Sequence, residues 1–252
     1  MSTALITGAS NGIGLEIARV LAPDHDLVLV ARNTAALDAL AAELGGAQVI
    51  TADLADPGAV ARLVAAVPNV DVLVNNAGVG DFGAFAETDL DKTLGMIQLN
   101  VTSLTALTRA YLPGMLERGS GRIMNLASTA SFQPGPLMAV YYATKAYVLS
   151  FTEAIAEETR GSGVTVTALC PGPTESGFQS AADMELSPLV ANKKLPTSAE
   201  VAAYGVEAMN SGDVVAIPGW LNKIMATGTR FTPRPVMRRV VHKMQATKPA
   251  KT

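Results

Sequence analysis

The sequence is poor in the features that mark several other classes of protein. Among its 252 residues there is a single cysteine, Cys170, so no internal disulfide can form, and a reducing compartment is expected. No apolar run approaches the ~20 residues that span a bilayer. No basic segment followed by an apolar one stands at the N-terminus, so we expect no secretory signal. These absences favour a soluble, cytoplasmic protein.

Histidine is almost as scarce as cysteine. Neither His25 nor His242 stands in a plausible group of metal ligands, so no metal site is predicted. The net charge of −3 is mild, and we expect no nucleic-acid partner. Charged residues make up 16% of the chain and hydrophobic residues 49%, which is typical of a well-buried globular protein rather than a disordered one.

What the chain does contain is an alternation of strand-like and helical patterns. Short apolar runs predict seven strands, at residues 4–7, 26–31, 47–51, 70–74, 122–127, 164–169 and 214–217. Helical patterns lie at 12–21, 34–44, 57–66, 99–117, 141–160 and 198–210. Strands that are apolar on both faces need helices on both sides. We predict an α/β fold with an open, doubly wound parallel sheet of about seven strands. The segment 171–196 has no clear periodicity and is expected to be a mobile loop or lid.

A glycine-rich turn joins the first predicted strand to the first helix. It reads T-G-A-S-N-G-I-G at residues 7–14, with Gly8, Gly12 and Gly14 in a G-x-x-x-G-x-G spacing. Glycines permit a tight turn and a close approach of cofactor phosphates, which the positive end of the following helix attracts. Ser10 and Asn11 can add neutral hydrogen bonds. The pattern predicts dinucleotide binding; the alternative is a purely structural turn.

Arg32 follows the second predicted strand, where the choice of cofactor is set. Enzymes that prefer NAD place a carboxylate there for the ribose hydroxyls, whereas this chain has Ala31 and then Arg32. An arginine can pair with the 2′-phosphate of NADP. We therefore predict NADP(H), with an ordinary solvated arginine as the alternative.

Tyr141 and Lys145 are four residues apart, so a helix places them on one face. A nearby ammonium lowers the pKa of a tyrosine from its ordinary value of ~10, and Tyr141 can then exchange a proton with a carbonyl or alcohol oxygen. Tyr142 is out of register with Lys145 and is the weaker candidate. Ser128 follows the fifth predicted strand, at the sheet edge where such folds bind ligands. Its hydroxyl can stabilise developing negative charge on the substrate oxygen.

Together with N-N-A-G at residues 75–78 and Asn100, these signals resemble, in this order, the short-chain dehydrogenase/reductase family in its compact form. The resemblance runs from about residue 3 to about residue 220. It implies a Rossmann-type fold and a catalytic set of Asn100, Ser128, Tyr141 and Lys145. The 13-residue separation of Ser128 from Tyr141 is typical of the family, and it favours Ser128 over the nearby Ser131.

The same resemblance, with the motifs above, implies the cofactor contacts. They are Gly8, Ser10, Asn11, Gly12, Ile13, Gly14, Arg32, Asp53, Leu54, Asn76, Ala77, Gly78, Tyr141, Lys145, Pro171, Gly172 and Thr174. In the family, Asp53 matches a residue that contacts the adenine amino group, and the segment with Asn76 braces the sheet as well as lining the cofactor crevice. Asn100 matches a residue that holds a proton-relaying water near the lysine, and Thr174 one that approaches the nicotinamide carboxamide.

We therefore predict an NADP(H)-dependent oxidoreductase that moves a hydride between nicotinamide and a small carbonyl or alcohol substrate. Apolar residues expected over the substrate favour an apolar compound; they are Phe82, Phe85, Phe132, Leu137, Met138, Phe178, Met184, Leu186 and Leu189. One alternative is a non-catalytic NADP-binding regulatory protein, against which the intact catalytic set argues. Another is a different enzyme on this fold, such as an enoyl reductase or a sugar-nucleotide epimerase. The family's habit implies a homodimer or homotetramer, built from the helices at 99–117 and 141–160.

The C-terminal part differs from the rest in charge. From Val214 onward there are eight basic residues and no acidic ones, which leaves eleven basic and 22 acidic residues in the remainder. We predict one dinucleotide-binding and catalytic domain at 1–220 and a basic, partly helical extension at 221–252. There Met237, Val240, Val241 and Met244 recur at helical spacing. Such a helix either lies on an anionic membrane surface or packs on the body or a partner subunit, and the second reading is favoured.

Overall fold

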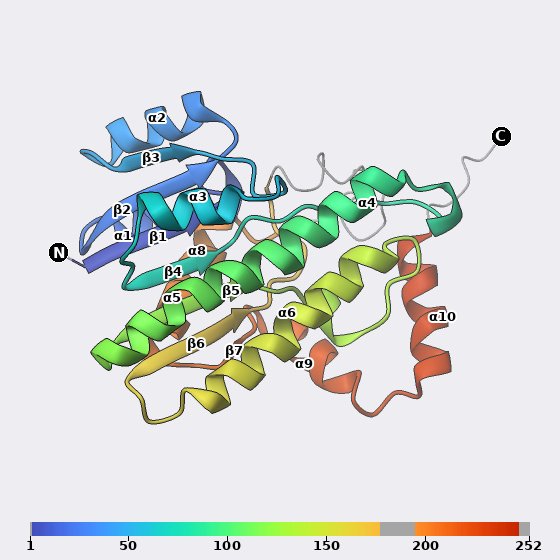
Figure 1. Cartoon of the computed structure of the whole chain (residues 1–252). Coiled ribbons are helices and arrows are strands. Elements are labelled where there is room, and N and C mark those ends of the chain that lie inside the picture. The colour runs from blue at the N-terminus through green and yellow to red at the C-terminus, as the bar shows by residue number, and fades with distance from the viewer. Residues whose placement is uncertain (1, 177–194, 247–252) are drawn as a thin grey trace.

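The computed structural model describes residues 2–176 and 195–246, in which seven parallel strands form one sheet (Figure 1). The strands are β1 (Ser2–Thr7), β2 (His25–Ala31), β3 (Gln48–Thr51), β4 (Val72–Asn75), β5 (Gly121–Leu126), β6 (Val164–Leu169) and β7 (Val215–Ala216). Their order is β3-β2-β1-β4-β5-β6-β7. The predicted doubly wound α/β sheet is confirmed. The order reverses between β1 and β4, and ligands of such sheets bind outside the carboxyl ends of the strands at this point.

Helices cover both faces of the sheet. They are α1 (Gly12–Leu21), α2 (Thr34–Glu43), α3 (Ala59–Ala66), α4 (Leu90–Ile97), α5 (Leu104–Arg118), α6 (Ala139–Glu158), α8 (Ser198–Ser211), α9 (Trp220–Gly228) and α10 (Arg234–Gln245). Short 3₁₀ turns are η1 (Phe85–Glu87) and η3 (Thr129–Phe132), and η2 (Gln98–Ser103) is a π-helix. In Figure 1, α3, α5 and α6 lie in front of the sheet, and α1 and α8 lie behind it.

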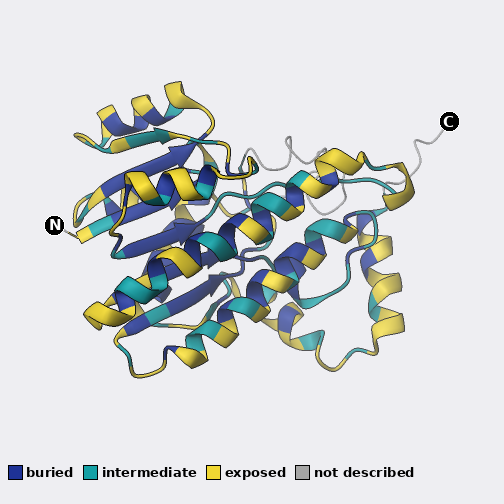
Figure 2. Ribbon diagram, in the orientation of Figure 1, coloured by how far each residue is buried: buried dark blue, intermediate teal, exposed yellow. Residues whose placement is uncertain are grey.

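The alternation of side chains along β1 shows why both layers form. Ala4 and Ile6 pack into one buried cluster, with residues of α1 and α8, whereas Leu5 packs into the other, with residues of α3 and α5. Successive residues of a strand point to opposite faces, so an apolar residue at every position requires cover on both sides. Figure 2 accordingly shows the central strands as buried and the outer sides of the helices as exposed.

One predicted helix boundary was wrong, and one helix was not predicted. The helix predicted at 99–117 begins earlier, because α4, the π-helix η2 and α5 follow one another without a break from Leu90. Its start is marked by Asp89, whose side chain accepts a hydrogen bond from the backbone N–H of Lys92 at 2.8 Å, an N-cap that the sequence displayed. The helix α9 was not predicted by itself, because it falls between the last strand signal and the repeat at 237–244.

The segment predicted as a loop or lid, 171–196, lies largely outside the described residues. Its two described ends are held together. The backbone N–H of Glu175 donates to the carbonyl oxygen of Pro196 at 2.8 Å, and the Ser198 hydroxyl donates to the carbonyl oxygen of Glu175 at 2.8 Å. The start of α8 is therefore fastened to the chain that leaves β6.

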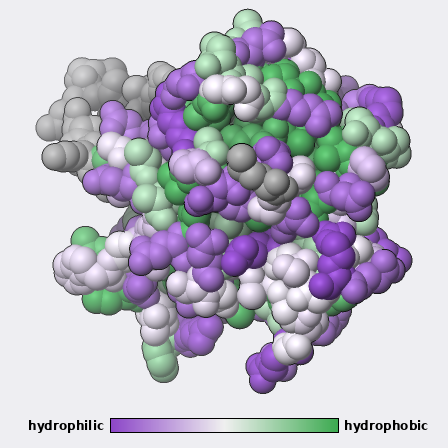
Figure 3. Space-filling model, turned by 90° about the vertical axis from the view of Figure 1, so that its left-hand side faces the viewer, coloured by the Kyte–Doolittle hydropathy of each residue, from purple (hydrophilic) through white to green (hydrophobic). Residues whose placement is uncertain are grey.

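No helix within residues 2–176 and 195–246 is long and apolar enough to cross a membrane. The end of the sheet where the strands begin faces the viewer in Figure 3, and hydrophilic and hydrophobic side chains are intermingled on it. The strands finish at the other end, where α10 stands (Figure 1), and predicted site residues that follow strand ends, such as Gly8, Arg32 and Ser128, lie there.

Candidate active site

The glycine turn between β1 and α1 is closely packed. Gly8 has a positive φ of 67°, which favours glycine, and its N–H donates to the carbonyl oxygen of Val30 at 2.7 Å. A Cβ atom on Gly14 would collide with the Gly8 carbonyl oxygen and the Asn76 side chain. The turn therefore requires glycine at these two positions for its own packing, whatever it binds.

Asn76 holds this turn in place. Its side-chain amide donates to the carbonyl oxygens of Thr7 and Gly8 at 2.9 and 3.1 Å. The Thr7 hydroxyl in turn accepts from the backbone N–H groups of Asn76 and Ala77, each at 3.0 Å. The bracing role implied for this segment is present; direct contact of Asn76 with the cofactor stays a prediction.

The residue before α1 does not cap the first turn of the helix with its side chain. Asn11 is the N-cap residue in an extended conformation, but its side chain makes no capping hydrogen bond. Unpaired N–H groups at a helix start are suited to bind an anion. Ser10 and Ile13 flank this position in the turn, so the residues named for phosphate binding lie together.

Arg32 and Asp53 come together at the ends of β2 and β3. The Arg32 side chain is 72% exposed, and its Nη1 atom is 3.8 Å from Oδ2 of Asp53. The other carboxylate oxygen of Asp53 accepts from the backbone N–H of Ala55 at 2.9 Å. An exposed pair at this distance is worth little, so the guanidinium is available to another anion.

Asn100 lies in the π-helical turn η2 and is buried. Its side-chain amide donates to the Val79 carbonyl oxygen at 2.9 Å and the Thr144 hydroxyl at 3.1 Å. Its Oδ1 accepts from the Val79 N–H at 3.0 Å. Single π-helical turns inside α-helices occur frequently at functional sites. Here the side chain of Asn100 links the Val79 loop to α6, and no pattern in the sequence marks Thr144 as its partner.

Lys145 is buried on α6, one turn after Tyr141. Its ammonium donates to the carbonyl oxygen of Leu126 at 2.6 Å and lies 5.8 Å from the centre of the Tyr141 ring. Burial lowers the pKa of Lys145 to about 8. A Cβ atom on Gly78 would be 3.2 Å from Oδ1 of Asn100 and 3.5 Å from Nζ of Lys145, so the predicted residues Gly78, Asn100 and Lys145 meet at one point.

Ser128 and Ser131 have different partners. Burial raises the pKa of Tyr141, and a hydrogen bond with the Ser128 side chain acts against that rise. The Ser128 hydroxyl also accepts from the N–H of Ala130 at 3.1 Å. The Ser131 hydroxyl donates instead to the backbone carbonyl oxygen of Lys145 at 2.7 Å. Of the two serines, Ser128 is the one that bonds to Tyr141.

The turn after β6 lies next to Ser128. The carbonyl oxygen of Pro171 accepts from the Thr129 N–H at 2.9 Å, and the Thr174 hydroxyl donates to the Gly172 carbonyl oxygen at 2.9 Å. A Cβ atom on Gly172 would be 2.9 Å from the side chain of Asn222 on α9. This contact brings a residue of the basic C-terminal segment to the predicted nicotinamide turn, and the sequence reasoning did not include it.

Cys170 precedes this turn and is fully buried. Burial raises the pKa of its thiol to about 12. The thiol is therefore uncharged near neutral pH and is a packing residue rather than a nucleophile.

An apolar cluster borders Tyr141. It contains Ala130, Met138, Tyr142 and Val241, with Phe82, Tyr141 and Met237 packed against it. Phe82 and Met138 thus lie where the sequence predicted substrate-facing residues. Phe132 does not, because it packs under α6 with Val148 and Cys170. The predicted residues Phe178, Met184, Leu186 and Leu189 lie outside the described part of the chain.

Helix α10 contributes to this cluster, which the sequence reasoning missed. Val241 and Gln245 are buried, and the Gln245 amide donates to the hydroxyl of Tyr142, a residue 103 positions earlier. Tyr142, the weaker candidate for the general acid, therefore anchors the C-terminal helix. The apolar repeat at 237–244 did predict a helix, and that helix packs on the body through Met237 and Val241, whereas Val240 and Met244 are exposed.

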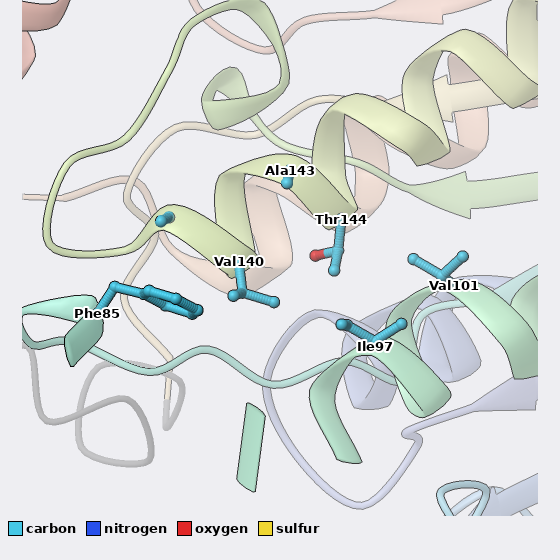
Figure 4. Close-up of a pocket in the computed structure, with 7 residues that line it drawn as sticks. Phe85, Ile97, Val101, Val140, Ala143 and Thr144 are labelled. Carbon is cyan, nitrogen blue, oxygen red and sulfur yellow. The ribbon is translucent and has the colours of Figure 1, made fainter. Parts of the chain in front are cut away.

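An open apolar groove of about 430 Å³ lies between α6 and the helix formed by α4 and η2 (Figure 4). It is lined by Phe85, Ile97, Val101, Ala139, Val140, Ala143 and Thr144. Figure 4 shows Ile97 and Val101 on one side, facing Val140 and Thr144 across the groove. Leu90 and Leu94 of α4 are also exposed. Their spacing places them on the same side of the helix as Ile97, so the apolar surface continues beyond the groove.

The fold and the site together define a nicotinamide-binding α/β domain with Ser, Tyr and Lys side chains grouped at the carboxyl edge of its sheet. The family profile described as short chain dehydrogenase matches residues 2–186. The chain belongs to the short-chain dehydrogenase/reductase family. It is an NAD(P)-dependent oxidoreductase, and the non-catalytic alternative is not favoured.

Similar proteins agree with this assignment. The chain is 32% identical over 249 residues to the ketoacyl reductase HetN of a Nostoc species, covering 94% of this chain and 87% of that one. It is 38% identical over 179 residues to a 3-oxoacyl-(acyl-carrier-protein) reductase of a Synechocystis species, covering 67% and 72%. A solved short-chain dehydrogenase from Sphingobium yanoikuyae in complex with NADPH superposes with a TM-score of 0.83 at 30% identity, covering 100% and 98%.

Proposed function

We propose that the protein reduces an apolar ketone or aldehyde with NADPH, with Tyr141 as the general acid. The observation that carries this proposal is the convergence of Ser128 and Lys145 on Tyr141. Burial raises the pKa of Tyr141, so its phenol holds a proton near neutral pH. A phenol in this state can donate to a carbonyl oxygen, which is what reduction requires.

The other side chains have separate tasks. The Ser128 hydroxyl, already bonded to Tyr141, is placed to hydrogen-bond the same substrate oxygen and to stabilise its negative charge. Lys145, with a pKa of about 8, is mostly positive near neutral pH and stabilises the tyrosinate left after proton transfer. Asn100 fixes the Val79 loop beside Lys145 and completes the proposed set. When bound, the cofactor supplies the hydride.

The cofactor preference for NADP(H) rests on Arg32. A weakly held, exposed guanidinium at the end of β2 suits the 2′-phosphate, because arginine binds phosphate through paired hydrogen bonds. The closely packed glycine turn and the uncapped start of α1 fit the pyrophosphate. The remaining residues proposed to hold the cofactor are Asp53, Leu54 and Gly78 beside the crevice, and Pro171, Gly172 and Thr174 at the nicotinamide.

The apolar cluster supports an apolar substrate. Phe82, Met138 and Met237 pack around Tyr141, and a carbonyl compound that reaches the phenol contacts this surface. Both curated relatives described above are ketoacyl reductases by name, which favours reduction of a ketone over oxidation of an alcohol.

The groove on α6 supports a homodimer or homotetramer. Its apolar lining lies on η1, α4, η2 and α6, and the last two overlap the helices that the family resemblance suggested for subunit contact. We also propose a cytoplasmic location, since the reaction draws on a soluble cofactor.

The decisive experiment follows the oxidation of NADPH, and separately of NADH, over a panel of aldehydes, ketones and 3-ketoacyl thioesters with wild type and Tyr141→Phe. We expect turnover with NADPH that falls by about 10²–10⁴-fold in the variant. Tyr142→Phe is the matched control and should keep its turnover. Preference for NADH would overturn the cofactor proposal alone, and activity that survives in Tyr141→Phe would remove Tyr141 as the acid.

A further inference from the structure

The helix α9 turns an apolar face to solvent. Its inward side carries Asn222, which packs against Gly172, and the buried Ala226. Its outward side carries Trp220, Leu221, Ile224 and Met225, with exposed fractions of 70, 57, 60 and 52%. The spacing 220, 221, 224, 225 places all four on one side of a helix.

Phe231 extends this surface just beyond the helix. It is 84% exposed, the highest value among the large apolar residues of the described chain. Single exposed apolar residues are ordinary, but five within twelve positions form a surface that normally has a partner. We define these five residues, Trp220, Leu221, Ile224, Met225 and Phe231, as the α9 face.

Positive charge accumulates in the chain segment that carries the α9 face. The described residues from Val214 to Ala246 include six basic side chains, Lys223, Arg230, Arg234, Arg238, Arg239 and Lys243, and no acidic one. All six are exposed, and none of them takes part in the ion pairs found within residues 2–176 and 195–246. Lys223 lies over the Tyr204 ring at 5.7 Å.

From this combination we propose that the α9 face docks on an anionic lipid surface. Apolar side chains flanked by cations are the pattern of segments that lie in the membrane interface, and aromatic residues such as Trp220 and Phe231 prefer the headgroup level. Basic residues close to the surface are attracted by anionic headgroups. The helix α10 adds exposed arginines and three further apolar side chains, Val236, Val240 and Met244, which are 48, 44 and 39% exposed, while Val241 and Gln245 are buried against the body.

A second copy of the chain fits this surface less well. A twofold contact places the same patch opposite itself, so the cations of this segment would lie near those of the second copy, and residues 214–246 contain no acidic residue to compensate them. Like charges in such an interface are unfavourable. The charge complementarity therefore selects an anionic surface over self-association.

The test uses the full chain and its single tryptophan. Trp220 is exposed, so its fluorescence should shift to shorter wavelength when vesicles cover it. We expect this shift, together with co-sedimentation, with vesicles of phosphatidylcholine mixed with phosphatidylglycerol. Neither effect is expected with phosphatidylcholine alone, and added salt should weaken both because it screens the attraction.

Variants separate the two contributions to binding. Leu221→Ser combined with Ile224→Ser keeps Trp220 as the probe and should weaken vesicle binding by about tenfold or more. Arg238→Glu combined with Arg239→Glu should weaken it similarly. The matched control is Val20→Ser with Leu116→Ser, two exposed apolar residues elsewhere, and it should bind like wild type. NADPH turnover in solution should be unchanged in all three.

Three results would overturn the proposal. The first is failure of the wild type to bind anionic vesicles. The second is equal binding by the Leu221/Ile224 variant and the wild type. The third is a tryptophan shift that appears without vesicles as the protein concentration rises. If sedimentation velocity then shows an oligomer that the Leu221/Ile224 variant does not form, a second copy of the chain is the occupant.

Discussion

The carboxyl edge of the sheet and the C-terminal helices differ in how far their polar and charged side chains are buried and hydrogen-bonded. At the edge, Asn100, Ser128 and Lys145 are held by hydrogen bonds to named neighbours, and Lys145 keeps an ammonium buried. In α9 and α10, one side packs on the body and the other is exposed, with apolar side chains prominent on α9 and arginines prominent on α10. At the edge, the cost of burying the Lys145 ammonium accompanies the positioning of reactive groups. The C-terminal helices bury only the side that attaches them to the body.

This comparison predicts the largest effect at Lys145. Lys145→Met removes the buried charge next to Tyr141, so we expect kcat/KM to fall by about 10²–10⁴-fold. The same substitution removes the cost of burying an ammonium, so the variant should be no less stable than wild type near neutral pH. Steady-state kinetics and urea unfolding measure the two quantities. A variant both inactive and strongly destabilised would show that Lys145 holds the fold and not the reaction.

The lowered pKa of Lys145 also gives a sign for pH dependence. Below about 8 the lysine is protonated in both folded and unfolded chains, and the full burial cost applies; between about 8 and 10.5 the folded state releases its proton first. Stability linked to this group therefore rises with pH in that window. Wild type should gain about 2 kcal/mol of unfolding free energy relative to Lys145→Met between about pH 7.5 and pH 9.5.

The two neighbouring serines sharpen the comparison within the edge. Ser128 bonds to Tyr141, whereas the Ser131 hydroxyl bonds to the backbone of α6. Ser128→Ala should lower kcat by about 10²-fold or more, because a group that stabilises charge on the substrate oxygen is lost. Ser131→Ala should change kcat by less than about threefold and lower the melting temperature instead. The reverse result would assign the catalytic role to Ser131.

Arg32 tests the cofactor end of the same edge. Arg32→Ala should raise KM for NADPH by about tenfold to a hundredfold, since a charged hydrogen bond to phosphate is removed, while KM for NADH changes little. Arg62→Ala is the control, because Arg62 also forms an exposed ion pair with an aspartate, Asp56. An equal change with both cofactors would indicate a general effect on the crevice rather than recognition of the 2′-phosphate.

The smallest effect on turnover is expected at the packed side of α10. Gln245→Leu leaves the buried Tyr142 hydroxyl without its partner, which should cost about 1–3 kcal/mol of unfolding free energy. Turnover at saturating substrate should change by less than about threefold in the same variant, because Tyr142 is not the acid. In a double-mutant cycle with Tyr142→Phe, the pair should show coupling. A loss of turnover without a loss of stability would place α10 in the reaction itself.

The sequence alone predicted the alternation of strands and helices, the glycine turn, and a shared helix face for Tyr141 and Lys145. The family resemblance added the choice of Ser128 over Ser131. These features depend on local periodicity and on side chains that follow strand ends, and the sheet topology brings all strand ends to one edge. The helix start at Leu90 could also have been read, from the N-cap Asp89. The resemblance to a family supplied the remaining cofactor positions, which no local pattern marks.

Other features were decided only by tertiary structure. The bonds of Asn100 to Thr144, of Ser131 to the Lys145 carbonyl and of Gln245 to Tyr142 join residues 44, 14 and 103 positions apart. Which side of α9 is buried depends on where Asn222 meets Gly172, and nothing in the spacing of residues 220–228 specifies that contact. Hydrophobic spacing determines that a helix has an apolar side, but only the docking of the helices determines whether the protein or its surroundings cover it.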